Sequence, residues 1–156
     1  MILEVKQIGD PILRRKAHKI TRIDASIRKL ASDMLETMRE NNGVGLAAPQ
    51  IGESIRLIVV EYPENDEIED SPLISYKLIN PEITWMSEEK TIGVEGCLSF
   101  RGLAGEVERA ESVKIRALNI HGKPFNITAN GWLARIFQHE IDHLDGICYV
   151  DRAKKV

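Results

Sequence analysis

The sequence predicts an α+β fold in which mostly antiparallel strands surround a central helix. Residues 56–60 are rich in β-branched side chains and residues 113–118 alternate apolar with polar ones, as strands do. Two other segments have helical periodicity, and strand-like segments precede and surround the second of them. The 156 residues contain no internal repeat and no linker, so we expect one domain over residues 1–156.

The first helix is predicted over residues 24–41. Apolar side chains recur there at helical spacing, at Ile23, Ile27, Leu30, Met34 and Met38. Asp24 is suited to cap the N-terminus, and Asn41, Asn42 and Gly43 form a stop signal. We expect this helix to pack its apolar face on the core.

The middle of the chain is predicted to contain two loops and several strands. Three glycines among small apolar residues at 43–52 indicate a loop that exposes its backbone. The run at 56–60 is typical of a buried strand, whereas residues 61–72 are acidic, poor in apolar side chains and typical of a solvated loop. Residues 78–79 and 83–85 are predicted to be two short strands.

The last part of the chain is predicted to be a hairpin followed by a helix. After the clear strand noted above, residues 121–124 form a turn and residues 125–128 return as a strand. Asn130 is suited to cap a final helix over residues 131–145, and Gly146 is suited to end it.

Composition and charge restrict the class of protein. A net charge of −3 gives no reason to expect broad binding to nucleic acid, and we expect no specific DNA binding. No apolar run approaches the roughly 18 residues of a membrane span, and the N-terminus lacks the apolar core of a signal peptide. We therefore expect no membrane association and a cytoplasmic location, with an organellar or phage-encoded origin left open. A reducing compartment disfavours a disulfide between Cys97 and Cys148. Cys148 lies in an apolar run after the final helix and is expected to be structural.

The chemistry of the chain is concentrated in the predicted final helix, which contains a His-Glu-x-x-His run. His139 and His143 are four residues apart and therefore lie on one face of a helix. Two imidazoles in this arrangement can bind one metal ion, and Glu140 can act as general base on a metal-bound water. The flanking residues Ile136 and Ile141 are apolar, so the helix is expected to be buried and its histidines to need partners or a metal.

The third metal ligand is open at this point of the argument. A ligand downstream of the helix would indicate a zincin-type peptidase, but only Asp145 and Asp151 are available there. Upstream, Cys97 follows a glycine, and a thiolate with two imidazoles would leave one position for water, as catalytic sites do. An isolated cysteine is more often an inert buried side chain, so the choice depends on the need for a third ligand.

Three segments together resemble the signature motifs of the peptide deformylases. They are residues 43–50 (GVGLAAPQ), 95–99 (EGCLS) and 138–143 (QHEIDH), in the family's order. The similarity extends over nearly the whole chain. The resemblance implies a metal-dependent hydrolase that removes the formyl group from the N-terminal formylmethionine of new polypeptides and releases formate.

The resemblance also implies roles for individual residues. The metal ligands would be Cys97, His139 and His143. Glu140 would take and return the proton, and the Leu98 backbone N–H and the Gln50 side-chain amide would donate to the oxyanion. The substrate-binding residues would be Val44, Gly45, Leu46, Glu95, Gly96, Trp132, Arg135 and Ile136. Residues 44–46 would pair with the extended peptide, and the side chains of Val44, Glu95, Trp132, Arg135 and Ile136 would line its methionine pocket.

The implied cofactor is one divalent metal ion, Fe(II) in the cell, with nickel, cobalt or zinc possible in purified protein. The implied partners are N-formylmethionyl nascent peptides and the ribosome. The last motif lies close to Val156, whereas many bacterial members use a further C-terminal helix or tail for ribosome contact, so the docking mode is left open. The chain departs from the family at Arg101, where proline is common.

Two other functions are consistent with parts of the sequence. One is the zincin-type peptidase described above, which would not depend on Cys97. The other is a catalytically silent formyl-peptide-binding homologue, which would be expected to lose Glu140 or Gln50. Both residues are present, so the enzyme is the favoured interpretation.

Overall fold

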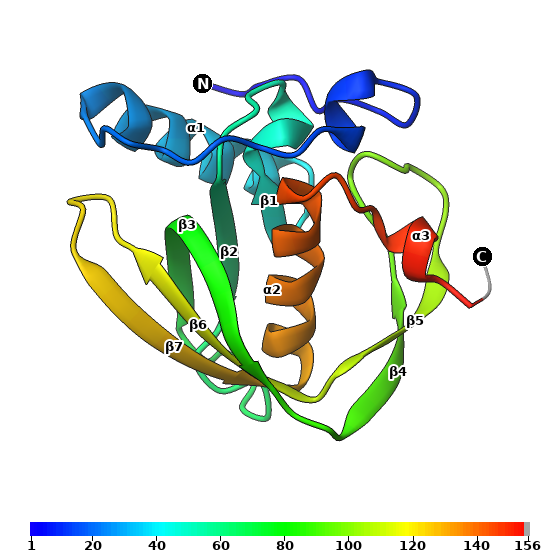
Figure 1. Ribbon diagram of the computed structural model, residues 1–156. Helices are drawn as coiled ribbons and strands as arrows, with labels where there is room; N and C mark the ends of the chain where they lie inside the picture. Colours follow the sequence, from blue (N-terminus) through cyan, green and yellow to red (C-terminus); the bar gives the residue numbers. More distant parts are fainter. Residues whose placement is uncertain (155–156) are drawn as a thin grey trace.

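The computed structural model describes residues 1–154 and places a long helix between two antiparallel sheets (Figure 1). The five-stranded sheet has the order β1-β2-β3-β6-β7, with β1 Gly45–Ala47, β2 Leu57–Pro63, β3 Leu73–Met86, β6 Ser112–Leu118 and β7 Pro124–Asn130. The two-stranded sheet pairs β4 Lys90–Glu95 with β5 Gly105–Ala110. The helices are α1 Ala25–Glu40, α2 Gly131–Leu144 and α3 Tyr149–Arg152, and short 3-10 turns cover Pro11–Arg14 and Ala48–Ile51. None of the helices within residues 1–154 is both long and apolar enough to cross a bilayer.

The core is organised around β2, which is buried on both faces. Ile58 and Val60 belong to the cluster that contains Phe137 of α2. Leu57 and Val59 belong to the cluster that contains Met38 of α1. Because successive side chains of a strand point to opposite faces, one continuous apolar run supports both helices. The predicted buried strand at residues 56–60 is therefore confirmed, and the strand continues to Pro63.

The predicted boundaries of α1 are confirmed. Asp24 accepts hydrogen bonds from the backbone N–H groups of Ser26 and Ile27, which satisfies two of the unpaired donors at the helix start. Asn41 caps the C-terminus. The methionines of this helix are fully buried against β1 and β2, so they serve packing.

Helix α2 has nearly the predicted bounds, but its caps differ from expectation. Asn130 occupies the N-cap position, yet its side chain accepts a hydrogen bond from Ser112 instead of capping the helix. Gly146 ends the helix as predicted, with a φ of +75°. A Cβ atom at this glycine would lie 2.5 Å from the carbonyl oxygen of Arg14. The close approach of the N-terminal segment therefore requires glycine at this position.

Four features of the strands differ from the prediction. The two short strands predicted near residues 78–85 are one strand, β3, whose register shifts between Ile79 and Glu82. Asn80 has a φ of +51° there, and its side chain bonds both the N–H and the C=O of Ile20, so a distant segment stabilises the irregularity. The solvated loop starts at residue 64 instead of residue 61, because β2 pairs with β3 as far as Pro63.

The other two differences concern short elements: β1 with the turn after it, and the β4–β5 hairpin. The segment 43–52, predicted to be a loop, contains β1 and the turn Ala48–Ile51, because Gly45–Ala47 pair with β2. The hairpin of β4 and β5 was not predicted. Its alternation of apolar and charged residues is brief, and its inward charged side chains are neutralised only by tertiary contacts.

Candidate metal centre

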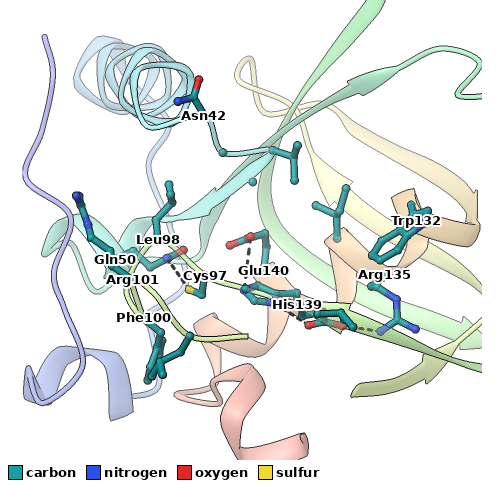
Figure 2. A pocket seen from close by; sticks show the side chains of 18 of the residues that line it. Asn42, Gln50, Cys97, Leu98, Phe100, Arg101, Trp132, Arg135, His139 and Glu140 are labelled. Atoms are coloured by element: carbon teal, nitrogen blue, oxygen red, sulfur yellow. Dashed lines mark hydrogen bonds and ion pairs between the residues drawn. The ribbon is translucent and has the colours of Figure 1, made fainter. Parts of the chain in front are cut away.

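A cavity of about 590 Å³ opens between β1, the loop after β4 and helix α2. Figure 2 shows Cys97, Glu140 and His139 near its middle, with Arg101 and Trp132 on opposite sides of Glu140. β1 is the edge strand of its sheet, and β4 pairs only with β5 among the described strands. The cavity therefore lies between two strand edges that pair with no further strand among the described residues.

The three predicted metal ligands lie together. The ligand atoms of Cys97, His139 and His143 all fall within 4.8 Å of one another. The histidines come from successive turns of α2, and the cysteine comes from the loop that follows β4. The Cys97 Sγ lies 3.4 Å from Nε2 of His143, so this nitrogen faces the centre. One sulfur and two nitrogens form a site for a single metal ion with an open position.

The imidazole of His139 is oriented by Glu95. Nδ1 of His139 lies 2.9 Å from Oε1 of Glu95, which leaves Nε2 to face the centre. Metal-binding histidines commonly use their second nitrogen in this way, because the hydrogen bond fixes the tautomer and the ring orientation. Glu95 is buried, so its carboxylate needs compensating charge.

Two buried arginines supply that charge. Arg109 forms a bidentate pair with the Glu95 carboxylate, at 2.9 and 2.8 Å. Arg135 donates to the same carboxylate at 2.7 Å and also to the carbonyl oxygen of Val107. Burial on its own raises the pKa of Glu95, but the hydrogen bonds from Arg109 and His139 outweigh it and hold the pKa well below its usual value. Glu95 is therefore an anion that joins helix α2, which carries the two histidines, to the β4–β5 hairpin.

The two histidines of the centre differ in the direction of their pKa shifts. Burial alone lowers the pKa of His139, but the carboxylate of Glu140 and the hydrogen bonds to Cys97 and Glu95 together raise it. Burial and the neighbouring charge of His139 lower the pKa of His143. In the absence of a metal, this environment stabilises a proton on His139 between acidic groups. A bound cation would take the place of that proton, so metal binding is expected to release it.

Glu140 lies beside the ligands without belonging to them. Its Oε2 is 4.0 Å from Nε2 of His139, and burial raises the pKa of its carboxyl group to about 7. Its Oε1 is buried and has no hydrogen-bond partner within residues 1–154. A Cβ atom at Gly45 would lie 2.6 Å from Oε2, so β1 approaches the carboxylate closely only because residue 45 is glycine. Cys97, His139 and His143 would hold a metal ion, and the carboxylate of Glu140 beside them could accept a proton from a water that the ion activates.

Gln50 and Leu98 lie on the other side of the cysteine. The Nε2 of Gln50 donates to Cys97 Sγ at 3.3 Å and to Ser99 Oγ at 3.2 Å, and its Oε1 accepts from the backbone N–H of Ala47. The side-chain amide is therefore held in one orientation with its donors toward the ligand sulfur. The N–H of Leu98 makes no hydrogen bond within the described part of the chain.

The residues expected to bind substrate have several different environments. Val44 and Trp132 are half exposed at the rim, whereas Ile136 is buried in the wall. Gly45, Gly96 and Arg135 also line the cavity, but the guanidinium of Arg135 is engaged by Glu95 and by backbone carbonyls. Leu46 is fully buried, and its side chain packs toward α1 instead of lining the cavity.

Sequence reasoning did not find several residues that support the centre. Arg109 bonds Asp142 as well as Glu95, and Arg152 of α3 bonds Asp142 from the other side. Tyr149 stacks on the His139 ring, with centroids 6.1 Å apart. The alternation in β5 was the one available signal for Arg109, because it places residues 107 and 109 on the buried face. The other contacts join segments that the sequence does not relate.

Comparison with known proteins agrees with this geometry. The family model described as Polypeptide deformylase matches residues 2–156. A peptide deformylase of Dictyoglomus thermophilum is 50% identical over 153 residues, which cover 98% of this chain and 94% of that protein. The crystal structure of peptide deformylase from Thermotoga maritima has a TM-score of 0.91 at 36% identity, with 99% of each chain covered. A Met-Ala-Ser-bound class I type b enzyme from Acinetobacter baumannii has a TM-score of 0.89 at 41% identity, with 97% of this chain and 98% of that one covered. The chain belongs to the peptide deformylase family, whose members are metallohydrolases that remove the formyl group from nascent peptides.

Proposed function

We propose that this protein, as a single catalytic domain, uses one divalent ion on Cys97, His139 and His143 to deformylate N-formylmethionyl nascent peptides and release formate. One observation carries the proposal: the buried carboxylate of Glu140 lies beside a Cys-His-His cluster, with Oε2 4.0 Å from Nε2 of His139 and with Oε1 lacking a partner within residues 1–154. Because formylmethionine begins newly made chains, we place the protein in the cytoplasm, with ribosomes as the source of its substrate.

We propose Fe(II) as the cellular metal, and the Cys-His-His donor set is compatible with it. Thiolate and imidazole ligands suit several first-row divalent ions, and availability and geometry decide among them. Nickel, cobalt and zinc fit the same donors in purified protein. A divalent ion held there would lower the pKa of a water bound to it and supply hydroxide near neutral pH. Because a thiolate is oxidised readily, purification without oxygen is expected to preserve activity.

Glu140 is the proton carrier in this proposal. Its carboxyl group lies beside His139, and burial raises the pKa of this group toward neutrality. A group with a pKa near the working pH can accept a proton in one step and return it in the next. Glu140 therefore takes the proton of the attacking water and later delivers it to the leaving amine.

Gln50 and Leu98 are the oxyanion donors. The Leu98 N–H has no hydrogen-bond partner among residues 1–154, and the amide of Gln50 is held beside Cys97 by its bond from Ala47. Donors fixed before the reaction stabilise developing charge without reorganisation. Gln50 needs only to exchange its weak contact with sulfur for the developing oxyanion.

The two strand edges support binding of an extended peptide. Gly45 on β1 and Gly96 after β4 both line the cavity, and a peptide between them can pair with backbone groups on each side. Ile136 and Trp132 offer apolar surface for a methionine side chain, and the charge of Arg135 is already neutralised by Glu95. The A. baumannii relative is a Met-Ala-Ser-bound structure, which supports a peptide that begins with methionine as the ligand.

The zincin alternative is disfavoured because neither candidate for its third ligand is directed at the centre. Asp145 pairs with Arg56 at 3.1 Å, and Asp151 pairs with Arg14 and caps Cys148 N–H, so neither faces the centre. The silent-homologue alternative is disfavoured because Glu140 and Gln50 are both placed at the cluster.

The proposal is tested directly by the metal content and activity of the Cys97→Ala protein. Anaerobically purified wild type should contain about one metal ion per chain, the number that one Cys-His-His site binds, and should release formate from a formyl-Met peptide. Cys97→Ala should lose both, whereas Cys148→Ala, which removes the other thiol, should keep both. A Cys97→Ala protein with full metal and activity would exclude the ligand set.

Glu140→Gln should keep the metal but lower turnover by about 10² or more, the range of general acid–base catalysis. Metal analysis and formate release on one sample check this, with the exposed Glu88→Gln as control. Turnover within a few-fold of wild type would show that Glu140 does not carry the proton.

Gln50→Ala should lower kcat by about 10²–10³ with KM and metal content nearly unchanged, because the amide meets the oxyanion only in the transition state. Gln50→Glu keeps an oxygen for the Ala47 N–H and should show a similar loss. A defect confined to KM would show that Gln50 binds the substrate and not the transition state. Loss of metal would show that Gln50 mainly supports Cys97 as a ligand.

A further inference from the structure

We propose that Arg101 determines specificity by favouring substrates with an acidic side chain at the second or third residue. The inference rests on the proposed function, because it assigns a preference within the same cavity. It concerns the peptide beyond the methionine, which neither the metal centre nor the methionine pocket contacts.

The position of Arg101 places it at the exit of the cavity. It lines the cavity on the loop after Cys97, is exposed, and lies on the side of Glu140 opposite Trp132 (Figure 2). Its Nη2 donates to the side-chain oxygen of Asn41, at the C-terminal end of α1, at 3.3 Å. This neutral contact holds the guanidinium at the rim and leaves most of its five N–H donors unused.

The charges of the cavity wall single out this arginine. The other ionised side chains of the lining are buried, and Glu95 bonds both Arg135 and His139. Arg101 has no ion-pair partner within residues 1–154. It is therefore an exposed cation of the lining with its charge uncompensated, and its planar guanidinium can bind a carboxylate with two parallel hydrogen bonds.

The expected path of the peptide brings the residues after methionine to the rim at Arg101. With the formyl group beside Glu140 and the methionine toward Trp132 and Ile136, the rest of the chain leaves over the opposite rim. Arg101 is exposed on that rim. An extended chain advances about 3.3–3.6 Å per residue, so the second and third residues pass within reach of a long arginine side chain.

Two peptide series test the inference, formyl-Met-X-Ala-amide and formyl-Met-Ala-X-amide, with X as Glu, Gln or Lys. The C-terminal amide removes the terminal carboxylate, which would otherwise bind the same arginine. At low ionic strength, kcat/KM should rank Glu above Gln above Lys in at least one series. Each step should be about two- to fivefold, the effect of an exposed ion pair. The difference should appear in KM, because Arg101 does not touch the reacting atoms, and should shrink at high salt.

Variants separate charge recognition from loop support. Arg101→Gln should remove the ranking, and Arg101→Glu should invert it so that Lys is preferred. Arg116→Glu makes the same charge change at an exposed side chain of β6 that does not line the cavity. It should leave the ranking unchanged. A wild-type protein that treats the three peptides alike in both series, or an Arg101→Glu protein that keeps the wild-type ranking, would overturn the inference.

The failure of the inference and the failure of the proposed function are distinguishable. Formate released from all peptides without a ranking would refute the role of Arg101 alone. No formate from any peptide would refute the proposed function. Calorimetric binding of the same formyl peptides to wild type and Arg101→Glu would then still decide the charge preference, because binding needs no turnover.

Discussion

The carboxylate of Glu95 is shared by Arg109, Arg135 and the imidazole of His139, and the metal centre depends on this interaction. It joins α2 to the β4–β5 hairpin, the two elements that carry the ligands. A buried ion pair contributes little net stability compared with an apolar pair, but it is costly to break. Its value here is geometric, because it fixes which nitrogen of His139 faces the centre.

The surrounding structure holds the same helix from its other sides. Apolar residues of α2, among them Phe137 and Ile141, pack against the five-stranded sheet. Gln138 bonds both backbone groups of Ala110, and Asp142 joins Arg109 to Arg152. Fold and site therefore use different faces of one helix. The short α3 supports the site face through Arg152 on Asp142 and Tyr149 on the His139 ring.

Local patterns predicted what depends on local spacing. The histidine pair, the cap at Asp24 and the stop at Gly146 follow from helix geometry, and the three motifs gave the family. The continuous strand β3 and the hairpin could not be read in this way, because Asn80 and the inward charges of the hairpin are satisfied only by distant segments. The environment of Glu95 was missed for the same reason: its partners come from β5 and α2.

The most direct test is the metal affinity of Glu95→Gln, measured by competition with a chelator and compared with Glu108→Gln, which removes one side of the exposed pair with Lys154. Glu95→Gln should lose about 10- to 100-fold in affinity and about 3–5 kcal/mol of unfolding free energy. The control should change stability by at most about 1 kcal/mol. A folded Glu95→Gln protein with wild-type metal affinity would contradict the claim that this carboxylate positions the centre.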